Sequence, residues 1–60
     1  MGERVVVERV DRGQGCYILH VRVEGGERRV LKVVASVPPR EGQRFLVVKE
    51  GGLLNVLQPL

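Results

Sequence analysis

Apolar and polar residues alternate along much of this 60-residue chain, and glycine or proline interrupts the alternation at short intervals. From Tyr17 to Val23 every second residue is apolar, and β-branched valines are frequent, which favours strand over helix. The interruptions lie at residues 11–15, Gly25-Gly26, Pro38-Pro39 and Gly51-Gly52. The pattern predicts five strands, over residues 3–10, 16–23, 28–34, 44–49 and 53–57.

The order of these strands predicts an all-β domain, a small five-stranded antiparallel barrel that spans residues 1–60. A three-strand meander, a longer connection and a closing hairpin resemble the topology of the oligonucleotide/oligosaccharide-binding fold. Pro38-Pro39 and Gly42 leave at most one helical turn in the connection, which a helix fills in that fold. We therefore expect a minimal version of that barrel or an SH3-like barrel.

Turn chemistry sets the register, and the register decides which side chains are buried. A two-residue turn at Gly25-Gly26 places Arg22 opposite Arg29 and Val21 opposite Val30. Pairing Val10 with Cys16 across the first turn adds the valines of the first strand to the same face. The predicted core is Val5, Val7, Tyr17, Leu19, Val21, Val30, Val34, Phe45, Val47, Leu54 and Val56.

Apolar residues of the opposite parity form a second face, and exposure of this apolar face to water is unfavourable. They are Val6, Ile18, Leu31, Val33, Leu46, Val48 and Leu57. One interpretation is a homodimer, or a docked partner protein, held through Ile18, Val33, Leu46 and Val48. The alternative is that residues 58–60 and the loop at residues 37–39 fold over this face.

Ten lysines and arginines against seven acids give a net charge of +3 and an isoelectric point near 9.8. Nucleic acid is the natural partner of such a surface. In the predicted register Arg4, Arg22 and Arg29 form a row on one face. These three arginines and Arg44 are the predicted phosphate contacts. The alternative is that this row is neutralised by Glu3, Glu8, Glu24 and Glu27.

The chain offers little for catalysis, with one serine, one histidine, one cysteine and one aspartate. Cys16 and His20 lie four residues apart on one strand, about 13 Å, which is too far for a catalytic pair. We therefore expect no catalytic residue, metal or cofactor. The two aromatic residues, Tyr17 and Phe45, are predicted in the core, which argues against base stacking on a single strand.

Residues 7–48 resemble a family of short bacterial all-β proteins of uncharacterised activity. The matching stretches are Val7-Glu8-Arg9-Val10, Cys16-Tyr17-Ile18-Leu19, Val23-Glu24-Gly25-Gly26-Glu27 and Pro38-Pro39-Arg40-Glu41-Gly42-Gln43. Glu8 stands where that family has aspartate, and the strand after the hairpin is more basic here. The resemblance implies a small barrel and carries no functional residues.

Two functions follow as expectations. The first is a non-enzymatic interaction module that self-associates or docks on a partner through the second apolar face. The second is a nucleic-acid accessory protein that uses its arginines on phosphates. The lone Cys16 suggests a reducing cytoplasm, and the excess of arginine over lysine resembles a heat-adapted chain.

Overall fold

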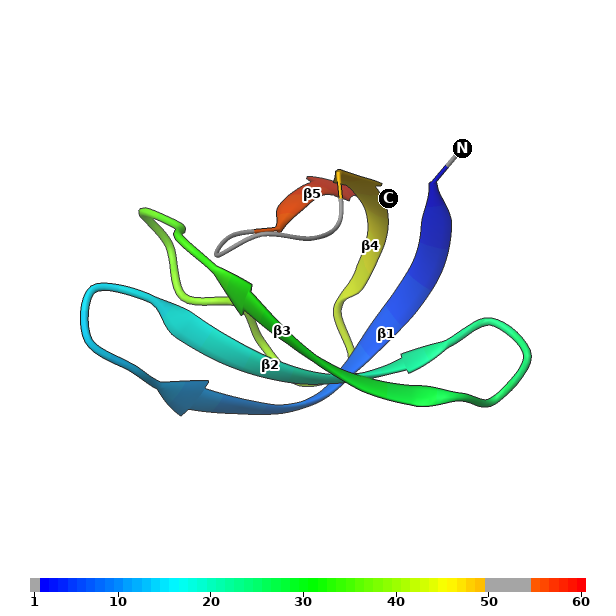
Figure 1. Cartoon of the computed structure of the whole chain (residues 1–60), viewed down its shortest axis with the longest axis horizontal. Helices are drawn as coiled ribbons and strands as arrows, with labels where there is room; N and C mark the ends of the chain where they lie inside the picture. The colour runs from blue at the N-terminus through cyan, green and yellow to red at the C-terminus, as the bar shows by residue number, and fades with distance from the viewer. Residues whose placement is uncertain (1, 50–54) are drawn as a thin grey trace.

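The computed structural model describes residues 2–49 and 55–60, and these residues form one antiparallel sheet of five strands, without a described helix (Figure 1). Their order across the sheet is β3-β2-β1-β4-β5. The strands are β1 (Glu3–Arg12), β2 (Tyr17–Val23), β3 (Arg28–Val33), β4 (Arg44–Lys49) and β5 (Val56–Pro59). The all-β class is thus confirmed. Within the described ranges no helix is long and apolar enough to cross a membrane.

The sheet curves but does not close, so the predicted barrel is corrected to an open, barrel-like sheet (Figure 1). Its edge strands are β3 and β5, and no ladder joins them in the described part of the chain. Asn55, just before β5, bridges this gap, because its backbone N–H and side-chain amide both donate to the Lys32 carbonyl oxygen, at 3.0 and 3.2 Å. We refer to this gap between β3 and β5 as the seam.

The turn of the β2–β3 hairpin contains three residues instead of the predicted two. The Val23 N–H donates to the Glu27 carbonyl at 2.7 Å, and the Gly26 N–H donates to the Val23 carbonyl at 2.8 Å. Gly25 and Gly26 both have positive φ, 107° and 103°, a region that side chains disfavour. The extra residue, Glu24, shifts the pairing of β3 by one position.

This one-residue shift exchanges the two faces of β3. Leu19 faces Leu31, and Tyr17 faces Val33, so both β3 residues enter the core. Val30 and Val34, which we predicted in the core, are 61% and 64% exposed instead. The alternation in β3 was read correctly, but its phase was wrong.

The β1–β2 pairing keeps its predicted faces although its register differs. Val7 faces Val21 rather than Leu19, a shift of two residues that leaves the parity unchanged. A β-bulge between Val7 and Arg9 then brings Val10 opposite Leu19. Val5 and Val7 therefore point inward as the sequence predicted, and the bulge adds Val10, which it did not predict.

Nine apolar side chains form the core on one face of the sheet, which we term the core face. They are Val5, Val7, Leu19, Val21, Val23, Leu31, Val33, Phe45 and Val47. Tyr17, Val10 and Leu57 pack against them and are partly buried. Val56, predicted in the core, is 50% exposed, because Leu57 faces Val47 and takes the inward position. The predicted core residue Leu54 lies outside the described residues.

Candidate nucleic-acid interface

The face opposite the core, which we term the outer face, carries a row of basic residues that crosses four strands. Arg22 of β2 pairs with Arg28 of β3 on one side and with Val6 of β1 on the other. Val6 in turn pairs with Arg44 of β4. Cross-strand partners present their side chains on the same face, so this row holds three arginines and one valine, which lies between Arg22 and Arg44.

Arg4 lies two residues before Val6 on the same face of β1 and meets the row at a surface depression. The depression has a volume of about 610 Å³, and its cationic lining residues are Arg4, Arg22 and Arg44. Its other lining residues are Val5, Val6, Val23, Glu24, Gly25, Gly26 and Leu60. The backbone tightens one wall, since the Glu24 N–H donates to the Arg4 carbonyl oxygen at 2.9 Å. We call this site the arginine depression.

The three arginines of the depression have no acidic partner among the described residues. The ion pairs among the described residues, within 4.0 Å, use Arg9, Arg28 and Arg29 as the cations, and Asp11 also contacts His20. Glu24 is the one acidic residue lining the depression, and its carboxylate forms no ion pair in the described part of the structure. Three of the four predicted phosphate contacts therefore meet at one site, and none of the three forms an ion pair with a carboxylate of the described residues.

The fourth predicted contact, Arg29, lies elsewhere. The three-residue turn pairs it with Val21, which places it on the core face, away from Arg22. Its guanidinium binds Glu3 at 2.6 Å and Glu27 at 2.9 Å, and its side chain is 27% exposed. The hydrogen bonds that it donates to Glu27 and, after it, to Glu3 raise the pKa of Arg29 above its ordinary value. The predicted pairing of Arg29 with Arg22 is therefore wrong.

Arg28 takes the position in the row that the sequence assigned to Arg29. Its Nε donates to the Glu8 carboxylate at 3.2 Å, and Glu8 lies at the β1 bulge. Of the four glutamates that the sequence offered as neutralising partners, Glu3 and Glu27 bind Arg29 and Glu8 binds Arg28. A three-residue reading of the 24–26 turn would have found Arg28 from the sequence.

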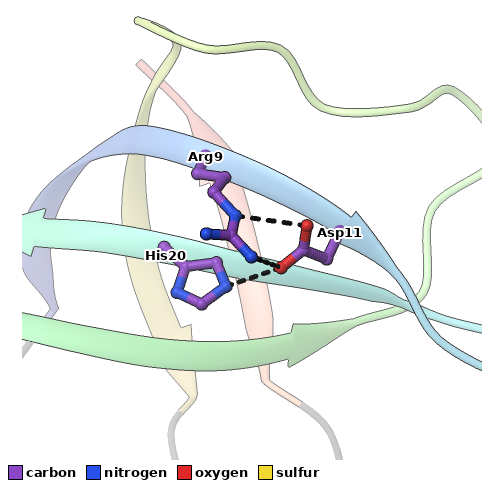
Figure 2. A network of polar contacts seen from close by, with 3 residues as sticks. All are labelled: Arg9, Asp11 and His20. Atoms are coloured by element: carbon purple, nitrogen blue, oxygen red, sulfur yellow. Dashed lines mark hydrogen bonds and ion pairs between the residues drawn. The ribbon is translucent and has the colours of Figure 1, made fainter.

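A second polar cluster lies further along the outer face, where Asp11 of β1 accepts from both Arg9 and His20 (Figure 2). The Arg9 guanidinium donates through Nε and Nη2, at 3.2 and 2.8 Å, and His20 Nε2 lies 2.9 Å from Asp11 Oδ2. The hydrogen bond from Arg9, and after it that from His20, lowers the pKa of Asp11. The cluster leaves Arg9 compensated, unlike the arginines of the depression.

The predicted apolar interface does not assemble as one surface. Val33 is only 4% exposed, because the register shift places it in the core. Ile18 and Leu46 are half-buried on the outer face, and Val48 is 54% exposed. Charged neighbours divide them, since Ile18 lies between Asp11 and Lys32 in the ladder.

The alternative prediction was that the loop at residues 37–39 and the tail at residues 58–60 fold over the second apolar face. Only part of this cover is found there. The loop instead lines a groove together with Val33 and Phe45 of the core face. From the tail, Leu60 lines the arginine depression, and its N–H donates to the Arg44 carbonyl oxygen at 3.2 Å. Leu60 is 63% exposed, so it borders the outer face without covering it.

The residues considered for chemistry are dispersed. His20 binds Asp11, whereas Cys16 borders the first turn, where a side chain at Gly13 would meet its Sγ at 2.8 Å. Within residues 2–49 and 55–60 no group of three or more His, Cys, Asp or Glu side chains could hold a metal ion. Phe45 is buried and Tyr17 packs against the core, so neither lines the arginine depression.

Comparison of the chain with protein-family models, with curated proteins and with solved structures found no match.

Proposed function

We propose that this domain binds the phosphate backbone of a nucleic acid through the arginine depression. The observation that carries the proposal is the meeting of Arg4, Arg22 and Arg44 at one hollow, without a carboxylate within ion-pair distance among the described residues. Guanidinium groups donate two parallel hydrogen bonds to phosphate oxygens, and Arg is the side chain best suited to that geometry.

A chain of phosphates suits this arrangement better than one phosphate. Arg22 and Arg44 lie two strands apart, with Val6 between them, so their Cα atoms are separated by roughly 10 Å. Arg28 extends the same row by one more strand. Guanidinium groups distributed along a line across the sheet match the repeated charges of a polynucleotide backbone.

The same geometry supports recognition of phosphate rather than of base sequence. The depression has no aromatic lining residue on which a base could stack, and the row presents charges and one valine. Phosphate contacts fix position on a nucleic acid but carry no sequence information. The proposal is therefore a sequence-independent, salt-sensitive contact. Strand order and the exposed β2–β3 face are also analogous to the binding face of oligonucleotide-binding barrels, an analogy of fold only.

The proposal is tested by measuring binding of a fluorescent DNA duplex by anisotropy at low salt, about 50 mM. The double variant Arg22→Glu with Arg44→Glu should lose binding. The matched control is Arg12→Glu with Arg40→Glu, which changes the net charge equally but lies outside the depression. The control should retain most of the affinity.

Two results would overturn the proposal. One is equal loss of binding in both double variants, which would indicate attraction by net charge alone. The other is absence of binding by the unmodified protein to duplex DNA, single-stranded DNA and RNA at the same salt. Circular dichroism of each variant excludes unfolding as the cause of a loss.

A further inference from the structure

A second concave site lies on the core face at the seam between β3 and β5, away from the arginine depression. It is a groove of about 610 Å³. Its lining residues come from the end of β3, the loop after it, the start of β4 and β5, and they include the core residues Val33 and Phe45. Alternation along β4 separates the two sites, because Phe45 lines the groove while Arg44 lines the depression. We call this site the seam groove.

Exposed apolar side chains concentrate in the seam groove. Six large apolar residues are exposed in the described part of the chain, and three of them line this groove. They are Val34, Val37 and Val56, which are 64%, 73% and 50% exposed. Clusters of exposed apolar groups on a small protein mark a surface that binds something.

Buried and hydrogen-bonded residues hold the loop and the start of β5 on the two sides of the groove. Pro39 is buried and anchors the loop. Beyond it, the Gly42 N–H donates to the Val7 carbonyl at 2.7 Å, and the Val7 N–H donates to the Gln43 carbonyl at 2.9 Å. On the opposite wall Asn55 is tied to Lys32 by two hydrogen bonds. A preformed groove avoids the entropic cost of ordering its walls on binding.

The backbone at the seam is poorly suited to pairing with an added strand. The Lys32 carbonyl oxygen already accepts two hydrogen bonds from Asn55. Pro38, Pro39 and Pro59 line the groove and have no N–H to donate. An occupant is therefore recognised by its side chains, and apolar side chains fit the exposed valines and the Phe45 floor.

Charge narrows the choice of occupant. Among the described residues that line the groove Arg40 is the only charged one, and no carboxylate in the described residues pairs with it. A second copy of this chain joined about a twofold axis would place two Arg40 guanidiniums in one apolar interface, which is unfavourable. An acidic group on the occupant is instead complementary to Arg40.

We infer that the seam groove docks a short segment of a partner protein that presents apolar side chains and one acidic residue, with the acidic residue at Arg40. The arginine depression and the seam groove then lie on opposite faces of one sheet. The domain could hold a polyanion on its outer face and a partner protein on its core face.

The inference is tested by selection of binding peptides from a displayed library of random decapeptides against the whole chain. The selected peptides should combine Leu, Val or Phe with Asp or Glu. When the Arg40→Glu variant is the target of the selection, Lys or Arg should replace the acidic residue. A selected acidic peptide should lose about tenfold or more in affinity for Arg40→Glu and for Val56→Asp, as removal of a complementary charge or apolar contact predicts. Val30→Asp, a matched exposed valine outside the groove, should leave affinity unchanged.

Methyl chemical-shift changes with a selected peptide should map to Val34, Val37 and Val56. Failure to enrich any common pattern would overturn the inference, as would enrichment that is unchanged by Arg40→Glu. Sedimentation of the unmodified chain at twice the monomer mass, abolished by Val56→Asp, would show a second copy in the groove and would also overturn it. None of these outcomes depends on nucleic-acid binding.

Discussion

Arg22 and Arg28 lie directly opposite each other in the β2–β3 ladder, so two guanidinium groups occupy neighbouring positions on the outer face. Among the described residues only Arg28 of this pair has an acidic partner, Glu8 at 3.2 Å. Like charges opposed across strands destabilise a sheet unless an anion lies between or beside them. A phosphate bound at Arg22 would therefore relieve repulsion between these two residues.

Salt dependence should report the number of arginines that contact phosphate. If Arg4, Arg22 and Arg44 each neutralise one phosphate of duplex DNA, the slope of log K against log salt is about −2.7. Arg22→Ala should reduce the magnitude of this slope by about 0.9. Anisotropy titrations across a salt series measure both slopes. Arg12→Ala is the control, and an equal reduction in its slope would contradict a localised site.

Glu24 opposes the proposed ligand, because its carboxylate lines the arginine depression. Glu24→Gln should strengthen duplex binding by roughly two- to fivefold at low salt, the range expected for one exposed charge. Glu41→Gln removes the same charge from the exposed loop outside the depression and should leave affinity nearly unchanged. Weaker binding by Glu24→Gln would indicate that this carboxylate orients an arginine instead.

The register of β3 can be tested with two adjacent truncations. Leu31→Ala removes a side chain that is 4% exposed and should lower the free energy of unfolding by about 2–5 kcal/mol. Val30→Ala alters a side chain that is 61% exposed and should change it by less than about 0.5 kcal/mol. Urea denaturation measures both. A larger loss of stability for Val30→Ala than for Leu31→Ala would contradict this register and support a two-residue turn.

The Asp11 cluster should make stability depend on acid pH. Hydrogen bonds from Arg9 and His20 hold the pKa of Asp11 below its ordinary value, 3.8. A lowered folded-state pKa means that the carboxylate stabilises the fold above that ordinary value, and that this stabilisation is lost as the pH falls through the folded-state pKa.

Asp11→Asn should therefore be less stable than the unmodified protein at about pH 6, and the two should converge near pH 2. Urea denaturation at the two pH values gives the difference. A constant difference across this range would show that the carboxylate charge is not what matters at this position.

Sequence reasoning located the strands better than their pairing. Glycine pairs and alternating valines placed β2 and β4 almost to the residue, since these signals are local. Local sequence does not fix the number of residues in the Gly25-Gly26 turn, because Glu24 can belong either to the turn or to the strand. In the structure Glu24 belongs to the turn, and the resulting register places Leu31 and Val33 in the core.

The candidate site was foreseen in part. The sequence predicted Arg4 and Arg22 on one face and added Arg44 to them, and the sheet order brings these three together at one depression. Arg29 failed because its parity followed the wrong turn length, and the predicted apolar interface lost Val33 for the same reason. The seam groove had no signal in the sequence, because it depends on the end of β3 lying beside the start of β5.

The sequence by itself determined that this chain forms β-strands with a basic surface, because side-chain branching, alternation and turn residues act over a few neighbouring positions. Tertiary structure alone decided which face of β3 is buried, which arginines retain an acidic partner, and where the sheet remains open. Those outcomes depend on contacts between residues distant in the chain, and a single added turn residue is enough to exchange an entire strand face.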